Sequence, residues 1–170
     1  MKRIILVSIA FLLIAFTGVV FIKFIKSLRI KTSIQKEMNT IPDFKFYSMD
    51  STEFTRDSLL DSLGVIFIHF HSNCEYCISE IEQIVENSSL LADVEILFIS
   101  YEDIDLIKEF RGNYNLQNHK QIKMLKDSDN SYYRNFGTSV IPSIIIYDKN
   151  GNLVRIFNGE ASVDAILKNL

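Results

Sequence analysis

The chain has two cysteines, Cys74 and Cys77, three positions apart in the segment HSNCEYCISE of residues 71–80. Two thiols at this spacing can form a reversible disulfide, share a metal ion or form a permanent bridge. A permanent bridge is disfavoured, because closing so small a loop constrains the unfolded chain little. Tetrahedral zinc needs two further ligands, and none is obvious among the three histidines, His69, His71 and His119. We interpret the pair as redox-active, with a metal site or coincidence as alternatives.

The residues around the pair predict a buried strand that runs directly into a helix. Residues 64–71, GVIFIHFH, form an apolar run typical of a strand covered on both faces. From Cys74 to about residue 87, apolar residues recur at helical spacings of three and four. Cys74 then lies at the helix N-terminus, where unpaired N–H groups favour a thiolate. Cys77, one turn later on the same face, can attack a mixed disulfide and release the product.

The other segments also alternate between strand and helix patterns. An Asn-Gly pair at residues 150–151 is a strong hairpin signal between the last two strands, and Ser162 is a suitable cap for the final helix. The remaining predictions are a hairpin within 42–59, strands at 93–100, 121–127, 142–148 and 152–158, and helices at 104–114, 131–136 and 162–170. This order, β-α-β-α followed by β-β-α, predicts an α/β domain with a central mixed sheet flanked by helices.

The N-terminal segment predicts a membrane anchor. Residues 4–22 contain no charged residue, and as a helix they span about 28 Å, close to the roughly 30 Å of a bilayer's hydrocarbon core. A cleaved signal peptide is the alternative, but no clear small-x-small cleavage site follows. We expect an uncleaved anchor with basic flanks at residues 1–31, a polar linker at 32–41 and a folded domain at 42–170.

Charge is distributed unevenly along the chain. All 21 acidic residues follow position 31, and with twelve basic residues that part carries a net charge of −9. An acidic domain argues against nucleic-acid binding. Two basic residues precede the apolar segment and four follow it within nine positions, which by itself favours a cytoplasmic domain. Disulfide exchange favours the opposite orientation, because disulfides form outside the cytoplasm, and we expect an extracytoplasmic domain.

Residues 42–170 resemble the membrane-anchored thioredoxin-like proteins of the TlpA and ResA kind, within the redoxin (AhpC/TSA) superfamily. The matching features, in chain order, are Pro-Asp-Phe at 42–44, a buried strand before CEYC, Ile141-Pro142 before SIIIYDKNGNLV, and Gly159 ahead of the last helix. The resemblance implies a thioredoxin-like fold with an N-terminal hairpin extension, and a single-pass thiol–disulfide oxidoreductase on the outer side of a bacterial inner membrane. It also implies that Pro142 is a cis-proline opposite the cysteines.

The resemblance further implies a role for Glu80, because the reductase branch has a glutamate three residues after its second cysteine. Helical spacing places Glu80 on the face of Cys77, where it could move the Cys77 proton. The alternative is a solvated glutamate, as expected for Glu82 and Glu86. The residues expected to contact substrate are Phe70, Asn73, Tyr76 and Ile141.

Several residues depart from the family pattern. Asn73 replaces the usual tryptophan before the first cysteine, Tyr76 replaces a common proline, and Ile68 stands where thioredoxins have a buried aspartate. Phe70 and Tyr76 could supply an aromatic rim in place of the tryptophan. These departures leave the redox potential and the partner open.

The predicted function is reduction of disulfides in secreted or periplasmic proteins. Cys74 attacks the substrate, Cys77 resolves the mixed disulfide, and a membrane electron donor reduces the pair again; no cofactor or resident metal is expected. The alternative is a non-catalytic binding module or copper carrier that uses Cys74, Cys77 and His71. A peroxidase is disfavoured, because its pattern requires a threonine where His71 stands.

Overall fold

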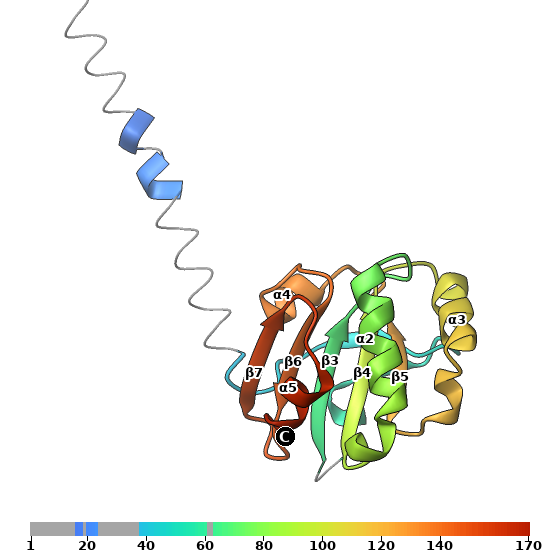
Figure 1. Ribbon diagram of the computed structural model, residues 1–170. Helices are drawn as coiled ribbons and strands as arrows, with labels where there is room; N and C mark the ends of the chain where they lie inside the picture. The colour runs from blue at the N-terminus through green and yellow to red at the C-terminus, as the bar shows by residue number, and fades with distance from the viewer. Residues whose placement is uncertain (1–15, 19, 24–37, 61–62) are drawn as a thin grey trace, which may run out of the picture. The chain divides into compact units, whose positions relative to one another are not determined.

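Strand β3 (Gly64–His69) lies inside a seven-stranded sheet of order β2-β1-β5-β4-β3-β6-β7 (Figure 1). The computed structural model describes residues 16–18, 20–23, 38–60 and 63–170. β3 pairs in parallel with β4 (Val94–Ser100) and antiparallel with β6 (Ser143–Tyr147). The other strands are β1 (Lys45–Tyr47), β2 (Glu53–Thr55), β5 (Ile122–Lys126) and β7 (Leu153–Asn158).

Helices cover both faces of the sheet. Helices α2 (Glu75–Glu86), α3 (Ile104–Asn113) and α5 (Val163–Leu167) lie over one face (Figure 1). Their apolar residues pack with Ile66, Ile68 and Phe70 of the central strand and its extension, which alternation directs to this side. The helices bury this continuous apolar layer, which fixes α2, and with it the two cysteines, against the end of β3.

The opposite face packs an aromatic cluster. Phe67 of β3 lies 4.7 Å, ring centroid to centroid, from Phe136 of helix α4 (Tyr132–Phe136), and 5.3 Å from Phe44. Phe44 is the last residue of the Pro-Asp-Phe segment, and its ring also stacks on Phe46 of β1. Edge and tilted contacts of this kind add to the burial of large rings. The aromatic residues therefore attach the N-terminal hairpin to the sheet.

The predicted order of strands and helices is confirmed. The β6–β7 turn contains Gly151 at φ 76°, and the β1–β2 turn contains Ser51 at φ 67°. Ser162 caps α5 by accepting the Ala165 N–H at 3.3 Å. Short 3-10 helices, which the hydrophobic pattern does not reveal, lie at Arg56–Ser58, Ser88–Leu91 and Leu116–Asn118.

Packing of the domain begins a few residues before Pro42. Met38 and Ile41 are buried, and the Leu153 N–H donates to the Asn39 carbonyl at 2.9 Å. Residues Glu37–Leu170 form one compact unit. The predicted membrane segment at 4–22 lies outside the described residues except at 16–18 and 20–22. Within the described part of the chain, no helix combines the length and apolarity needed to cross a membrane.

Candidate active site

Cys74 is the N-cap residue of α2, so its thiol lies beside backbone N–H groups that have no partner inside the helix. The Cys77 N–H donates to Cys74 Sγ at 3.3 Å. The Cys74 N–H closes the preceding turn on the His71 carbonyl at 3.1 Å. The Cys74 side chain is partly exposed. An accessible sulfur at a helix N-terminus is in a position to act as a nucleophile.

Cys77 lies one turn into α2 and has 2% of its surface exposed. Both cysteines are free thiols. Burial raises the pKa of the Cys77 thiol, and the hydrogen bond with Cys74 and the nearby Glu80 carboxyl raise it further. Cys77 is therefore protonated at neutral pH and must lose its proton before it can attack a disulfide.

Glu80 is buried, with 1% of its surface exposed. One carboxyl oxygen accepts the Ala161 N–H at 3.1 Å, and the other has no hydrogen-bond partner among the described residues. Burial raises the pKa of Glu80 to about 8, which outweighs the opposite effect of the Ala161 hydrogen bond. The interpretation of Glu80 as a solvated glutamate is therefore wrong, whereas Glu82 and Glu86 are exposed. A carboxyl with this pKa can exchange a proton near neutral pH.

Pro142 follows a cis peptide bond from Ile141, as the resemblance implies. The next residue, Ser143, pairs with His69 at the end of β3, and the chain from His69 leads to Cys74. Pro142 therefore lies at the same end of the sheet as the cysteines. It is buried, and Ile141 is half-buried against the core cluster that contains Cys77.

The four residues predicted to contact substrate divide into two groups. Asn73 and Tyr76 are exposed and Ile141 is half-buried, so all three are accessible. The prediction for Phe70 is wrong, because its side chain is 1% exposed and packs 5.0 Å from Phe110, centroid to centroid. Strand alternation directs Phe70 to the face that the helices cover, so it belongs to the core and not to an aromatic rim.

The two strand histidines have different surroundings. His69 is buried and stacks on Tyr132 at 4.3 Å, and neither ring nitrogen has a hydrogen-bond partner among the described residues. Burial lowers the pKa of His69 to about 4. His71 is half-exposed beside Glu102. No group of three His, Cys, Asp or Glu side chains suited to a metal ion occurs in the described ranges.

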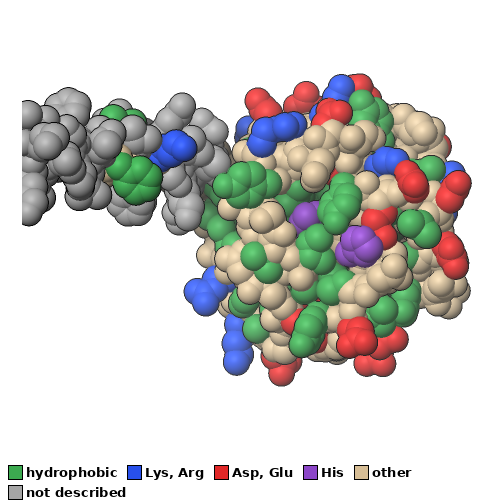
Figure 2. Space-filling model, turned by 90° about the horizontal axis from the view of Figure 1, so that it is seen from above, with side chains coloured by type: hydrophobic (Ala, Val, Ile, Leu, Met, Phe, Trp, Pro, Cys, Tyr) green, Lys and Arg blue, Asp and Glu red, His purple; other side chains and the backbone are tan. Residues whose placement is uncertain are grey.

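Hydrophobic side chains surround the histidines at this end of the domain (Figure 2). Exposed hydrophobic residues occur in the segments that meet there, namely Tyr76, Tyr101, Tyr133 and Val140. Of these, the sequence analysis identified Tyr76 alone. Tyr133 belongs to α4, and Tyr101 and Val140 to two different loops, so their proximity depends on the fold and leaves no signal in the spacing along the chain.

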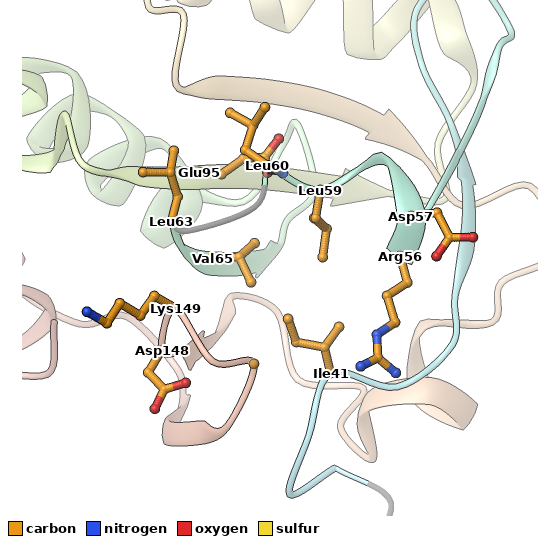
Figure 3. A pocket seen from close by; sticks show the side chains of 11 residues that line it. Ile41, Arg56, Asp57, Leu59, Leu60, Leu63, Val65, Glu95, Asp148 and Lys149 are labelled. Carbon is orange, nitrogen blue, oxygen red and sulfur yellow. Dashed lines mark hydrogen bonds between the residues drawn. The ribbon is translucent and has the colours of Figure 1, made fainter.

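A pocket of about 340 Å³ lies at the opposite end of the sheet (Figure 3). It is lined by Val65 and Glu95, near the starts of β3 and β4, and by the turn after β6. Glu95 is buried, pairs with Lys123 and accepts the Leu60 N–H at 3.0 Å. The pocket is therefore remote from the cysteines.

Solved structures show which fold this architecture has. The chain is similar to MTB DsbF, with 23% identity and a TM-score of 0.64 over 74% of this chain and 91% of that one. It is also similar to a secreted Mycobacterium tuberculosis disulfide oxidoreductase homologous to E. coli DsbE, with 18% identity and a TM-score of 0.63 over 74% and 92%. For StoA from Bacillus subtilis, identity is 11% and the TM-score 0.58 over 76% and 97%. At these identities the likeness establishes the fold, which is thioredoxin-like.

A thioredoxin-like fold with two free cysteines at a helix start, and with a cis-proline at the same end of the sheet, defines the class of thiol–disulfide oxidoreductases. No curated protein matches the sequence. The model of the AhpC/TSA family matches residues 38–156, and the chain belongs to that family.

Proposed function

We propose that this protein reduces disulfide bonds of extracytoplasmic proteins through Cys74 and Cys77. The observation that carries the proposal is the asymmetry of the pair. Cys74 is accessible and receives an N–H on its sulfur, whereas Cys77 is buried and protonated. Such an arrangement suits an attacking cysteine and a resolving cysteine.

The reaction has two exchange steps. The Cys74 thiolate attacks one sulfur of the substrate disulfide, forms a mixed disulfide and releases the other sulfur as a thiolate. The Glu80 carboxylate then accepts the Cys77 proton, and the Cys77 thiolate attacks Cys74 Sγ. The second substrate sulfur leaves as a thiolate, the two substrate thiolates take up one proton from Glu80 and one from water, and the enzyme retains a Cys74–Cys77 disulfide. A membrane electron donor then returns two electrons to the pair.

The substrate surface follows from the positions of the accessible residues. Ile141 lies just before β6, next to the buried Pro142, and Asn73 and Tyr76 lie close to Cys74 in the chain. An extended protein segment placed between them presents its disulfide to Cys74. The hydrophobic side chains of this end favour apolar residues next to the substrate cysteine.

The proposed location is the outer side of a bacterial cytoplasmic membrane, with residues 4–22 as a single-pass anchor. The uncharged length of this segment supports the anchor, and disulfide chemistry supports the orientation. A membrane-impermeant thiol reagent added to intact cells should label Cys74. Labelling only after lysis contradicts this orientation.

The function is tested by a single turnover with the full chain. The reduced protein, mixed with excess oxidised insulin, should release one substrate dithiol per Cys74–Cys77 pair and become oxidised itself. Alkylation and mass measurement count both products. Absence of transfer, together with stoichiometric retention of copper(I), contradicts the proposal and supports a copper-binding module.

A further inference from the structure

The parallel strands β3 and β4 separate just before Cys74. Their backbone pairing extends to a hydrogen bond from the Phe70 N–H to the Ile99 carbonyl, at 3.0 Å. Beyond this hydrogen bond, the segment after β3 turns toward α2 and the segment after β4 turns toward α3. The segment that leads to Cys74 therefore has no backbone pairing with the segment after β4, and other contacts must fix its conformation.

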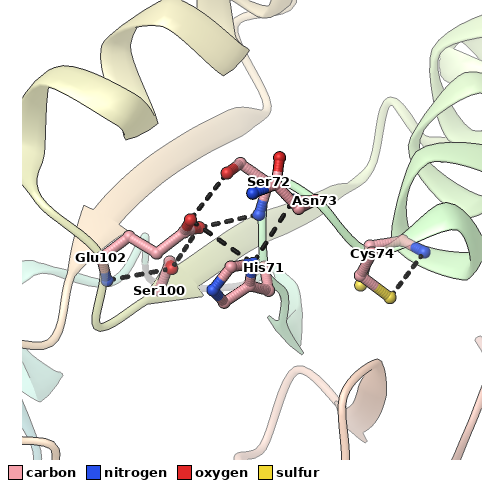
Figure 4. Close-up of polar contacts among 7 residues, drawn as sticks. His71, Ser72, Asn73, Cys74, Ser100 and Glu102 are labelled. Atoms are coloured by element: carbon pink, nitrogen blue, oxygen red, sulfur yellow. Dashed lines mark hydrogen bonds and ion pairs between the residues drawn. The ribbon is translucent and has the colours of Figure 1, made fainter.

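The carboxylate of Glu102 supplies these contacts (Figure 4). Ser72 donates to it twice, from its N–H at 2.7 Å and from its hydroxyl at 2.6 Å. The hydroxyl of Ser100, the last residue of β4, donates to it at 3.0 Å. The Glu102 side chain is 4% exposed. Hydrogen bonds to a buried carboxylate are stronger than those between neutral groups. Glu102 therefore connects the segment after β3 to the segment after β4, where the two strands no longer pair.

His71 extends this connection. Its Nδ1 lies 3.4 Å from Glu102 Oε1 and accepts the Asn73 N–H at 3.3 Å. The carboxylate therefore binds Ser72 directly and lies close to the His71 ring, which in turn accepts the Asn73 N–H. The segment also contains the turn from the Cys74 N–H to the His71 carbonyl, and the His71 ring lies 5.9 Å from that of Tyr101, centroid to centroid.

We propose that Glu102 is a positioning residue of the dithiol centre. It fixes the His71–Asn73 segment so that Cys74 keeps the N-cap conformation in which its sulfur receives the Cys77 N–H. Glu102 acts through Ser72 and does not touch the reacting sulfur. The inference rests on the proposed function, because it explains how Cys74 is held for exchange.

Two substitutions of Glu102 separate position from charge. Glu102→Gln keeps an oxygen that can accept from Ser72 and Ser100 and adds an amide that can donate to the Ser72 hydroxyl. Glu102→Ala removes every contact. In the full chain at pH 7, Cys74 alkylation by iodoacetamide should be about tenfold slower for the alanine variant and within about threefold of wild type for the glutamine variant. The midpoint potential of the Cys74–Cys77 pair should differ from the wild-type value in Glu102→Ala and lie closer to it in Glu102→Gln.

Glu95 provides the matched control. It is a buried carboxylate near the start of β4, the strand that ends two residues before Glu102, and it also accepts a backbone N–H, that of Leu60. Glu95→Ala should lower the melting temperature, because it leaves Lys123 and the Leu60 N–H without this partner. It should leave Cys74 alkylation and the midpoint potential unchanged. If Glu95→Ala lowers the stability without slowing Cys74 alkylation, loss of stability cannot explain slower alkylation in Glu102→Ala.

If Glu102→Ala folds and has the same Cys74 alkylation rate and the same midpoint potential as the wild-type protein, the inference is overturned. If Glu102→Ala does not fold, Ser72→Ala provides the test, because it removes only the hydroxyl that donates to Glu102. This variant should slow Cys74 alkylation about threefold. An unchanged rate in Ser72→Ala then overturns the inference. If the wild-type pair is not reversibly oxidised, the proposed function fails, while the alkylation rates still test the position of Cys74.

Discussion

Replacing Cys77 by serine should yield a protein that attacks disulfides but cannot release them, whereas Cys74→Ser should abolish exchange. Cys74 is accessible and Cys77 is 2% exposed, so an incoming disulfide meets Cys74 first. Without Cys77 the mixed disulfide persists. The loss of turnover should reach at least about 10³-fold in both variants, because covalent chemistry depends on both thiols.

Non-reducing gels and intact-mass measurements distinguish the two variants. A covalent adduct of defined mass should accumulate with Cys77→Ser and be absent with Cys74→Ser. Reduction should release the substrate from the adduct. The reverse pattern, with the adduct on Cys77, would contradict the assigned roles, as would equal trapping by both variants.

Glu80→Gln should slow the resolving step about 100-fold while leaving the first attack by Cys74 unchanged. The Cys77 thiol has a raised pKa, so resolution requires a base, and a positioned carboxylate typically contributes 10²–10⁴-fold. Glutamine has a similar shape but cannot accept the proton. Stopped-flow mixing with excess substrate disulfide separates mixed-disulfide formation from its decay.

The pH dependence provides a second signature of Glu80. Its pKa is about 8 in the folded protein, against an ordinary value of 4.5. Because the raised pKa favours the protonated form, this group's contribution to stability is complete below about 4.5 and is lost as the pH rises toward about 8. The resolving rate should increase over the upper part of this range, as the carboxylate forms.

Glu80→Gln should remove the Glu80 contribution to both pH profiles, since glutamine does not titrate. Denaturant unfolding between pH 4 and 9 measures the stability, and the kinetic experiment repeated over this range measures the rate. Glu82→Gln is the matched control, because Glu82 is an exposed carboxylate on the same helix. Equal effects at the two positions would show that Glu80 has no specific role.

Local patterns in the sequence explain which features could be predicted. The CxxC spacing, the strand before it and the Asn-Gly turn are each encoded by neighbouring residues, and the structure has all three. Glu80 could be identified because the family resemblance implies a glutamate three positions after the second cysteine, a helical spacing that places it on the face of Cys77. Its burial could not, because burial depends on packing near Ala161, 81 positions away.

Two errors or omissions have equally specific causes. The sequence places Phe70 on the substrate surface as an aromatic substitute for the missing tryptophan, but alternation directs it under the helices, where it contacts Phe98 and Phe110. Glu102 has no motif around it, and its partner Ser72 lies 30 positions earlier. Only the parallel pairing of β3 and β4 brings these two residues together, so the pairing had to be known first.

The most direct test of disulfide reduction is a redox titration of the full chain, with Cys74 and Cys77 followed by alkylation and mass measurement. A single two-electron midpoint near −270 mV, about the value of thioredoxin, is the expected result and indicates a reductant that needs an electron supply. A midpoint near −120 mV, about the value of a strong disulfide donor, or no reversible midpoint, would contradict the proposed function.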